Sequence, residues 1–154
     1  MGFQLKYLVF LFYVISFQPL NKGEKLDFNG KWILNFEKSK LEDISEGQTG
    51  SVFLIKQDGD KFSLKIVHIF GAREKKIGFK MIADGKTRSV KVLFKGKLEE
   101  IENGLRASLW RSNFSNIVDY EFGKDENELI ANERFKSSTK TYHNIWVFDR
   151  EILK

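Results

Sequence analysis

The sequence lacks several features that would narrow its function. It has no cysteine among its 154 residues, so disulfides, thiol catalysis and metal sites built on sulfur are excluded. It also contains no G-x-S-x-G or H-E-x-x-H motif and no glycine-rich phosphate loop, which are the signatures of common hydrolases, metalloproteases and nucleotide-binding enzymes. Internal repeats, low-complexity segments and linkers are absent as well. The chain is therefore predicted to form one domain, from about residue 26 to residue 154.

Apolar and aromatic residues are plentiful. Hydrophobic residues make up 42% of the chain and charged residues 31%, which is typical of a globular protein and not of a disordered or multi-span membrane chain. The 15 phenylalanines dominate an aromatic content of 14%. Large aromatic side chains favour β-strands and a large apolar interior.

The amino terminus has the pattern of a secretory signal. Lys6 precedes nine apolar residues, 7–15, and a polar break follows at 16–19. A short positive segment, a short apolar run and a polar break are typical of a signal peptide, whereas a membrane-spanning helix needs about 20 apolar residues. Residues 1–22 are predicted to be a signal peptide, with an uncleaved anchor as the alternative. The protein is then secreted or periplasmic, with no stable membrane span once the signal is removed.

The net positive charge of the predicted mature protein is smaller than that of the whole chain. Removing residues 1–22 takes away Lys6 and Lys22, which leaves 24 basic and 21 acidic residues and a net charge of +3. Lysines and arginines are scattered singly, and no RNA-binding aromatic motif accompanies them. A solvated basic surface explains this pattern, and no nucleic-acid partner is expected.

Hydrophobic residues recur at every second position through most of the chain. In residues 61–70, for example, Phe62, Leu64 and Ile66 share one phase with His68, while Ser63 and Lys65 occupy the other. Such alternation predicts strands with one buried face. Ten strands are expected near 28–37, 51–58, 61–69, 74–82, 87–95, 97–102, 105–111, 115–122, 128–135 and 139–149. Only residues 37–44 have any helical character.

Turn signals separate these strands at short intervals. They include Asp58-Gly59, Asp84-Gly85, Lys95-Gly96 and Asn103-Gly104; such pairs accept the positive φ of tight hairpins. Strands joined by hairpins pair antiparallel and form a meander. The predicted fold is all-β, an antiparallel meander closed into a barrel of about 8–10 strands, because closure removes exposed edges. A β-sandwich is the alternative.

The two ends of the domain carry a family resemblance. Residues 28–35 read F-N-G-K-W-I-L-N, which resembles the Gly-x-Trp opening strand of the lipocalin and fatty-acid-binding (calycin) superfamily. Together with E-K-S-K at 37–40 and W-V-F-D-R at 146–150, it is similar to a bacterial exported lipocalin-like group. The resemblance implies that Arg150 packs over the Trp32 indole as a structural plug of the barrel.

The resemblance has limits that bear on the ligand. It covers short motifs at both ends and an all-strand middle, and the last strand reads T-Y-H-N-I-W from residue 141, without the carboxylate-binding Arg-x-Tyr of fatty-acid-binding proteins. The function it implies is non-catalytic binding of a small hydrophobic or amphipathic molecule in the barrel. The alternative is a solid barrel that serves as a structural or protein-interaction module of the cell envelope. An enzyme, a cofactor and a metal site are not expected.

Candidate ligand-binding residues come from the apolar phases of the predicted strands. His68 continues the apolar phase of its strand, and Arg111 continues that of Leu105, Ala107 and Leu109. An inward Arg111 needs a partner, either a ligand anion or a carboxylate such as Glu133. The strand carboxylates Asp119, Glu121 and Glu133 are otherwise interpreted as a solvated face. The predicted ligand-binding residues are Phe62, Leu64, His68, Phe79, Phe94, Arg111 and Tyr120.

Overall fold

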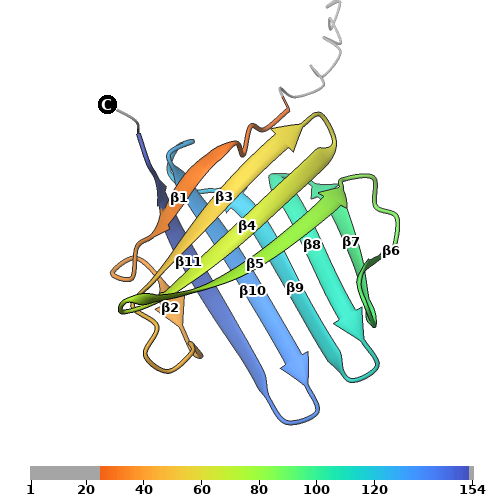
Figure 1. Cartoon of the computed structure of the whole chain (residues 1–154). Coiled ribbons are helices and arrows are strands. Elements are labelled where there is room, and N and C mark those ends of the chain that lie inside the picture. Colours follow the sequence, from red (N-terminus) through yellow and green to blue (C-terminus); the bar gives the residue numbers. More distant parts are fainter. Residues whose placement is uncertain (1–24, 153–154) are drawn as a thin grey trace, which may run out of the picture.

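The computed structural model describes residues 25–152 and consists of antiparallel strands (Figure 1). The described residues contain no helix. The strands are β1 (Gly30–Leu34), β2 (Lys40–Leu41), β3 (Gly50–Asp58), β4 (Lys61–Phe70), β5 (Arg73–Ile82), β6 (Arg88–Lys91), β7 (Phe94–Ile101), β8 (Gly104–Arg111), β9 (Phe114–Phe122), β10 (Glu128–Ser137) and β11 (Thr141–Arg150). The predicted signal peptide lies outside the described residues.

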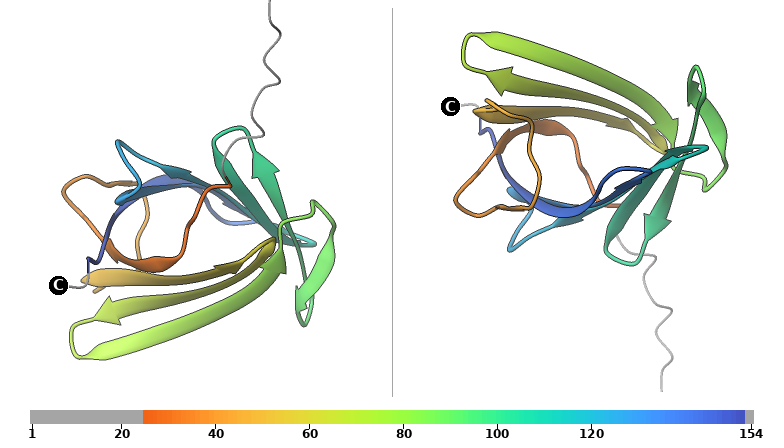
Figure 2. Two further views of the ribbon diagram at one scale, coloured as in Figure 1. Left: turned by 90° about the horizontal axis from the view of Figure 1, so that it is seen from above. Right: turned by 90° about the horizontal axis from the view of Figure 1, so that it is seen from below.

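The strands form one continuous sheet that curls into a barrel. Its order is β5-β4-β3-β1-β11-β10-β9-β8-β7-β6, and the short β2 pairs with β11 off this path. The first strand of the domain therefore pairs with the last, as Trp32 opposite Arg150 shows. Seen along the barrel, the strands surround a common centre (Figure 2). The predicted all-β barrel is confirmed, and the sandwich alternative is not found.

The barrel is nearly closed at the seam where β5 meets β6 and β7. No strand ladder joins them, but the amide of Gly85, just after β5, donates a hydrogen bond of 2.9 Å to the carbonyl of Leu98 in β7. The methyl end of Met81 lies against Gly96, where a side chain would also overlap Val90. Side-chain packing thus completes the wall where backbone pairing stops.

The β6–β7 hairpin turns at a place that the sequence did not indicate. The expected turn at Lys95-Gly96 is wrong, because Gly96 lies inside β7. The chain turns instead at Val92 and Leu93, which are 87% and 78% exposed. Leu93 takes a left-handed φ of 70°, which is unusual for a leucine. Two apolar residues in an alternating stretch give no turn signal, which explains the error.

Residues 37–44, the segment with helical character, contain β2 and no helix. The buried Asn144 of β11 holds this segment to the barrel. Its Oδ1 accepts hydrogen bonds from the backbone N–H groups of Glu42, at 2.8 Å, and Asp43, at 3.1 Å. These side-chain contacts satisfy backbone groups that a helix would otherwise have to pair.

Trp32 and Arg150 close one end of the barrel. Trp32 is fully buried, and the Arg150 guanidinium lies 4.3 Å from the centre of its ring system. Arg150 also donates hydrogen bonds of 3.1 Å to the backbone carbonyls of Asp27 and Asn29. The segment before β1 is thereby fixed across this end of the barrel, and Phe28 stacks on Phe122 beneath it.

Candidate functional site

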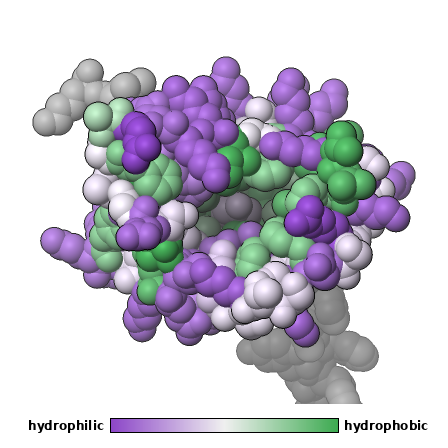
Figure 3. Space-filling view, turned by 60° about the horizontal axis from the view of Figure 1, so that its bottom comes forward, coloured by the Kyte–Doolittle hydropathy of each residue, from purple (hydrophilic) through white to green (hydrophobic). Residues whose placement is uncertain are grey.

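A cavity of about 330 Å³ lies inside the barrel. Its walls are mainly aliphatic and aromatic side chains contributed by β3, β4 and β5 on one side and by β7–β11 on the other. In the space-filling view from below, the surface is hollowed at its centre (Figure 3). The apolar lining includes Phe28, Phe53, Ile55, Phe62, Leu64, Ile66, Ile77, Phe79, Met81, Leu98, Leu105, Ala107, Leu109, Phe114, Val118, Ala131 and Trp146.

Strand periodicity explains why these side chains converge. On β8, Leu105, Ala107 and Leu109 point to the cavity, and across the ladder they face Tyr120, Val118 and Asn116 of β9. On β10, Ala131 and Glu133 follow in the same phase, opposite Tyr120 and Val118. Successive residues of a strand point to opposite faces, so one phase of the three neighbouring strands β8, β9 and β10 forms a continuous inner wall.

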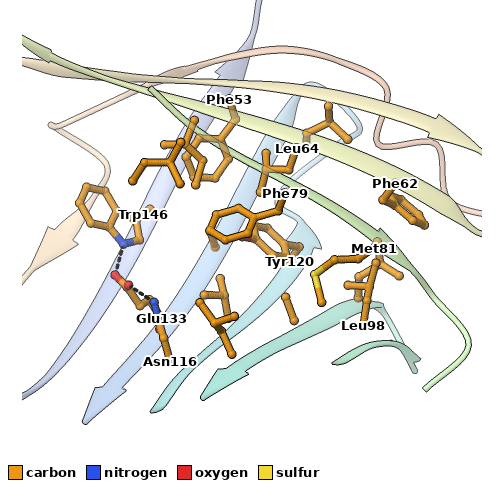
Figure 4. A pocket seen from close by; sticks show the side chains of 18 of the residues that line it. Phe53, Phe62, Leu64, Phe79, Met81, Leu98, Asn116, Tyr120, Glu133 and Trp146 are labelled. Carbon is orange, nitrogen blue, oxygen red and sulfur yellow. Dashed lines mark hydrogen bonds between the residues drawn. The ribbon is translucent and has the colours of Figure 1, made fainter. Parts of the chain in front are cut away.

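Glu133 places a carboxyl group in this apolar wall. Its Oε2 accepts a hydrogen bond of 2.7 Å from the indole Nε1 of Trp146 and one of 3.3 Å from Nδ2 of Asn144. Its Oε1 accepts a hydrogen bond of 2.9 Å from Nδ2 of Asn116. Figure 4 shows Glu133 held between Trp146 and Asn116. Three neutral donors therefore orient one acidic group at the cavity surface.

Asn116 leaves an acceptor without a partner in the same place. Because its Nδ2 donates to Glu133, its Oδ1 is turned elsewhere, and this oxygen is buried with no hydrogen bond. A buried polar atom without a partner costs about 1–3 kcal/mol. The cavity wall thus carries an unsatisfied acceptor beside a carboxyl group.

His68 adds a neutral polar group on the facing wall. Its Nδ1 lies 3.3 Å from Nε2 of Gln48 and 3.3 Å from Oγ of Ser51. Burial lowers the pKa of the imidazole, the charge of Lys75 lowers this pKa further, and the charge of Glu133 opposes both effects. Loss of hydration disfavours the charged imidazolium, so His68 is neutral at pH 7.

This pKa shift predicts how stability depends on pH. The unfolded chain protonates His68 near its ordinary pKa of 6.5, whereas the folded protein resists protonation there. The unfolded state then binds more protons, so the free energy of unfolding falls as the pH drops below about 6.5. Urea titrations at pH 7 and pH 5 are expected to show a smaller fall for His68→Gln than for the wild type. The exposed His143 provides the matched variant, His143→Gln, which should retain the wild-type fall; an equal fall in all three proteins would contradict the prediction.

The structure brings five of the seven predicted ligand-binding residues to the cavity: Phe62, Leu64, His68, Phe79 and Tyr120. Burial raises the pKa of the Tyr120 phenol, and the nearby charge of Glu133 adds to this effect. The phenol is therefore protonated at neutral pH.

Phe94 and Arg111 lie outside the cavity lining. Arg111 ends β8 at an exposed position, with its guanidinium 4.9 Å from the ring centre of Phe94 and 6.0 Å from that of Phe114. It does not pair with Glu133, whose partners are the three neutral donors already described. Arg111 shares the inward phase of Leu105. At Arg111, however, β8 has already reached the open end of the barrel, which we call the mouth.

Of the three carboxylates interpreted as a solvated face, Asp119 and Glu121 share the outer phase of β9, and Glu133 does not lie with them. Asp119 is on the outer face and bridges two strands: Arg106 donates to it from Nε at 2.6 Å, and Arg134 from Nη2 at 2.8 Å. Arg106 and Arg134 hold the pKa of the Asp119 carboxyl below its usual value. Glu133, in contrast, faces the cavity. The sequence suggested Glu133 only as a partner for an inward Arg111, although Glu133 shares its phase with Leu129, Ala131 and Phe135, which is the signal for its inward position.

No group of three or more histidine, aspartate or glutamate side chains within residues 25–152 is arranged to hold a metal ion. The same residues include no helix long and apolar enough to cross a membrane.

Comparison with known proteins places the fold. No protein-family model matches the sequence, and no curated protein is recognisably similar to it. The structure, however, resembles fatty-acid-binding protein 1 of Echinococcus granulosus, at 12% identity and a TM-score of 0.57, over 81% of this chain and 98% of that one. The chain therefore shares the β-barrel fold of this protein.

Two further solved structures are similar. The zebrafish ileal bile acid-binding protein, solved with cholic acid, matches at 15% identity and a TM-score of 0.52, over 80% of this chain and 98% of that one. An abundant heat soluble (SAHS) protein from Ramazzottius varieornatus matches at 15% identity and a TM-score of 0.58, over 80% of this chain and 95% of that one. At these identities the likeness concerns the fold.

Proposed function

We propose that this protein binds a small apolar or amphipathic molecule inside its barrel and does so without catalysing a reaction. The cavity of about 330 Å³, with its mainly aliphatic and aromatic walls, is the observation that supports the proposal. Ligand pockets are about 300–1,000 Å³, mostly apolar, with a few placed polar groups. The polar groups here are few and gathered around Glu133 and His68.

The structural neighbours are consistent with this function. Two of them are named for binding a fatty acid and a bile acid, and one was solved with cholic acid. The alternative of a solid barrel that works only through its outer surface is less well supported, because a solid barrel would have no cavity of this size. Export to the periplasm or the exterior, with an envelope protein as a further partner, belongs to the proposal; it rests on the sequence pattern of residues 1–22.

Filling the cavity tests the proposal. Ala107 lies on the inner face of β8, and Ala107→Trp would occupy space that a ligand needs. Titration with the neutral dye Nile red, whose fluorescence rises in apolar surroundings, is expected to show at least about a tenfold loss of affinity, or about 1.4 kcal/mol. Isothermal titration with decan-1-ol should show a loss in the same direction.

The matched control places the same side chain on the outside of the barrel. Ile117 is the neighbour of Val118 on β9 and points away from the cavity. Ile117→Trp should bind Nile red as the wild type does. Equal affinity in all three proteins, or no dye binding to the folded wild type, would contradict the proposed function.

A further inference from the structure

The cavity wall contains an acidic group and no basic one. Among the described residues that line it, Glu133 is the one with a formal charge at pH 7, and no lysine or arginine is present. The three groups that donate to its carboxylate are two amides and an indole. They orient the carboxylate but bring no positive charge to compensate it.

We propose, building on the proposed function, that the polar group of the bound molecule donates hydrogen bonds and carries no negative charge. A protonated amine is the best complement and a hydroxyl group the next. The cavity is then selective for long-chain or cyclic amines and alcohols over fatty-acid carboxylates.

Hydrogen-bonding capacity supports this assignment. Oε1 of Glu133 accepts one hydrogen bond, from Asn116, and an ionised carboxylate oxygen can accept about two. Oδ1 of Asn116 accepts none and is buried. The remaining capacity of Oε1 of Glu133 is therefore open to a ligand that donates hydrogen bonds.

Charge supports it independently. An anionic ligand group beside Glu133 would place two negative charges together in a weakly polar cavity, where like charges repel strongly. The neutral donors of the cavity, His68 on the facing wall and Tyr120 on the same wall as Glu133, can bind a hydroxyl oxygen but cannot offset a second negative charge.

Cations close to aromatic side chains define the competing arrangement, and one of them, Lys91, has its Nζ 5.1 Å from the ring centre of the cavity-lining Phe79. Arg111 lies over Phe94 and Phe114, and Lys140 lies 5.5 Å from the ring centre of Tyr142. A fatty acid could place its carboxylate against Arg111 and only its chain inside. In that arrangement Arg111, and not Glu133, would determine affinity, so substitutions at the two positions separate the alternatives.

The experiment compares three ligands of equal chain length. Decylamine, decan-1-ol and decanoate displace Nile red from the wild type at pH 7, each below its micellar concentration. The expected order of affinity is decylamine, then decan-1-ol, then decanoate, with at least about a tenfold difference between the first and the last, because a hydrogen bond to a charged group is stronger than one between neutral groups.

Variants then test the role of Glu133. Glu133→Gln keeps the shape and removes the charge, so decylamine affinity should fall at least about tenfold and decanoate affinity should rise. Its affinity for neutral Nile red reports whether the cavity is intact. Glu126→Gln, at an exposed turn position, removes a charge of the same sign and should change neither ligand. Should Glu133→Gln fail to fold, the wild-type order alone decides.

The outcomes are distinguishable. Decanoate that binds as tightly as decylamine, or an unchanged ligand order in Glu133→Gln, overturns this inference but leaves the proposed function in place. Decanoate affinity that depends on Arg111, measured with Arg111→Gln, also overturns it and assigns the polar site to the mouth. Failure of the folded wild type to bind Nile red overturns the proposed function itself.

Discussion

Replacing Trp32 with alanine is expected to lower the free energy of unfolding by about 3–5 kcal/mol, the range for deleting a large aromatic side chain from a core. Trp32 is fully buried and belongs to the main apolar cluster. The variant would leave a cavity at the end of the barrel that the backbone cannot collapse to fill, because β1 is paired on both sides, with β3 and β11. Urea denaturation followed by circular dichroism measures the change.

Two interactions besides apolar burial would be lost with the indole. Its Nε1 donates a hydrogen bond of 3.1 Å to the carbonyl of Phe28, and the Arg150 guanidinium stacks on its face. The Nε of Arg150 is already buried without a partner, so its guanidinium depends on the indole and on the carbonyls of Asp27 and Asn29. Removing the indole would release β1, β11 and the segment before β1 together.

Trp110 provides the comparison for this prediction. It is half-buried, lies outside the cavity lining and is the next-to-last residue of β8, where it pairs with Lys95 of β7 and Ser115 of β9. Trp110→Ala should cost less than half as much as Trp32→Ala. Because Trp32 does not line the cavity, the folded fraction of Trp32→Ala should keep the ligand order of the wild type. Equal stability of the wild type and Trp32→Ala would show that this end of the barrel does not depend on the indole.

The fold was largely predictable because period-two alternation is a strong local signal. The strands expected at 51–58, 61–69 and 115–122 lie within one residue of β3, β4 and β9. Alternation reports which face is buried, and antiparallel hairpins leave few choices of partner. The Asp-Gly turns were equally clear, since Gly59 and Gly85 have φ values of 60° and 70°.

The site was less predictable, because the alternation of a strand does not say where the barrel ends. Arg111 continues the inward phase of β8 but pairs with Phe114 at the exposed mouth. Phe114 in turn pairs with Ser137, so Glu133 sits four residues inside this level. The difference depends on the stagger of neighbouring strands around the barrel. That stagger is set by long-range pairing, such as Trp32 with Arg150, and is not encoded within any single strand.

Gly104 shows the same limit at a single position. Its place after Asn103 suggests a turn glycine with positive φ, but φ is positive at Gly30, Gly47, Gly59, Gly71 and Gly85 and not at Gly104. Gly104 is instead the buried first residue of β8, paired with Ile101 and with Glu121. A glycine is needed there because the chain of β9 passes too close for a side chain.

Gly104→Ala is therefore expected to destabilise the barrel strongly. A methyl group would overlap the carbonyl oxygen of Tyr120 and would lie 3.0 Å from its carbonyl carbon. These are backbone atoms within the β8–β9 ladder, so relief requires the strands to separate and not a side chain to rotate. Overpacking costs about 1–3 kcal/mol in general, and a clash with backbone belongs at the upper end of that range. Urea denaturation measures it.

Gly78→Ala is the matched variant, because it adds the same methyl group in a strand of the same barrel. Gly78 is exposed in the middle of β5, and the nearest atom to its added methyl, the carbonyl oxygen of Leu64, is 4.0 Å away. An alanine there meets no obstacle and restricts the unfolded chain more than glycine does, so stability should stay the same or rise slightly. If both alanine variants lost equal stability, strand propensity and not the approach of β9 would account for Gly104. A large loss at Gly104 alone would instead establish that β8 and β9 keep their spacing only because residue 104 has no side chain. These two strands form the wall that carries Asn116 and Tyr120.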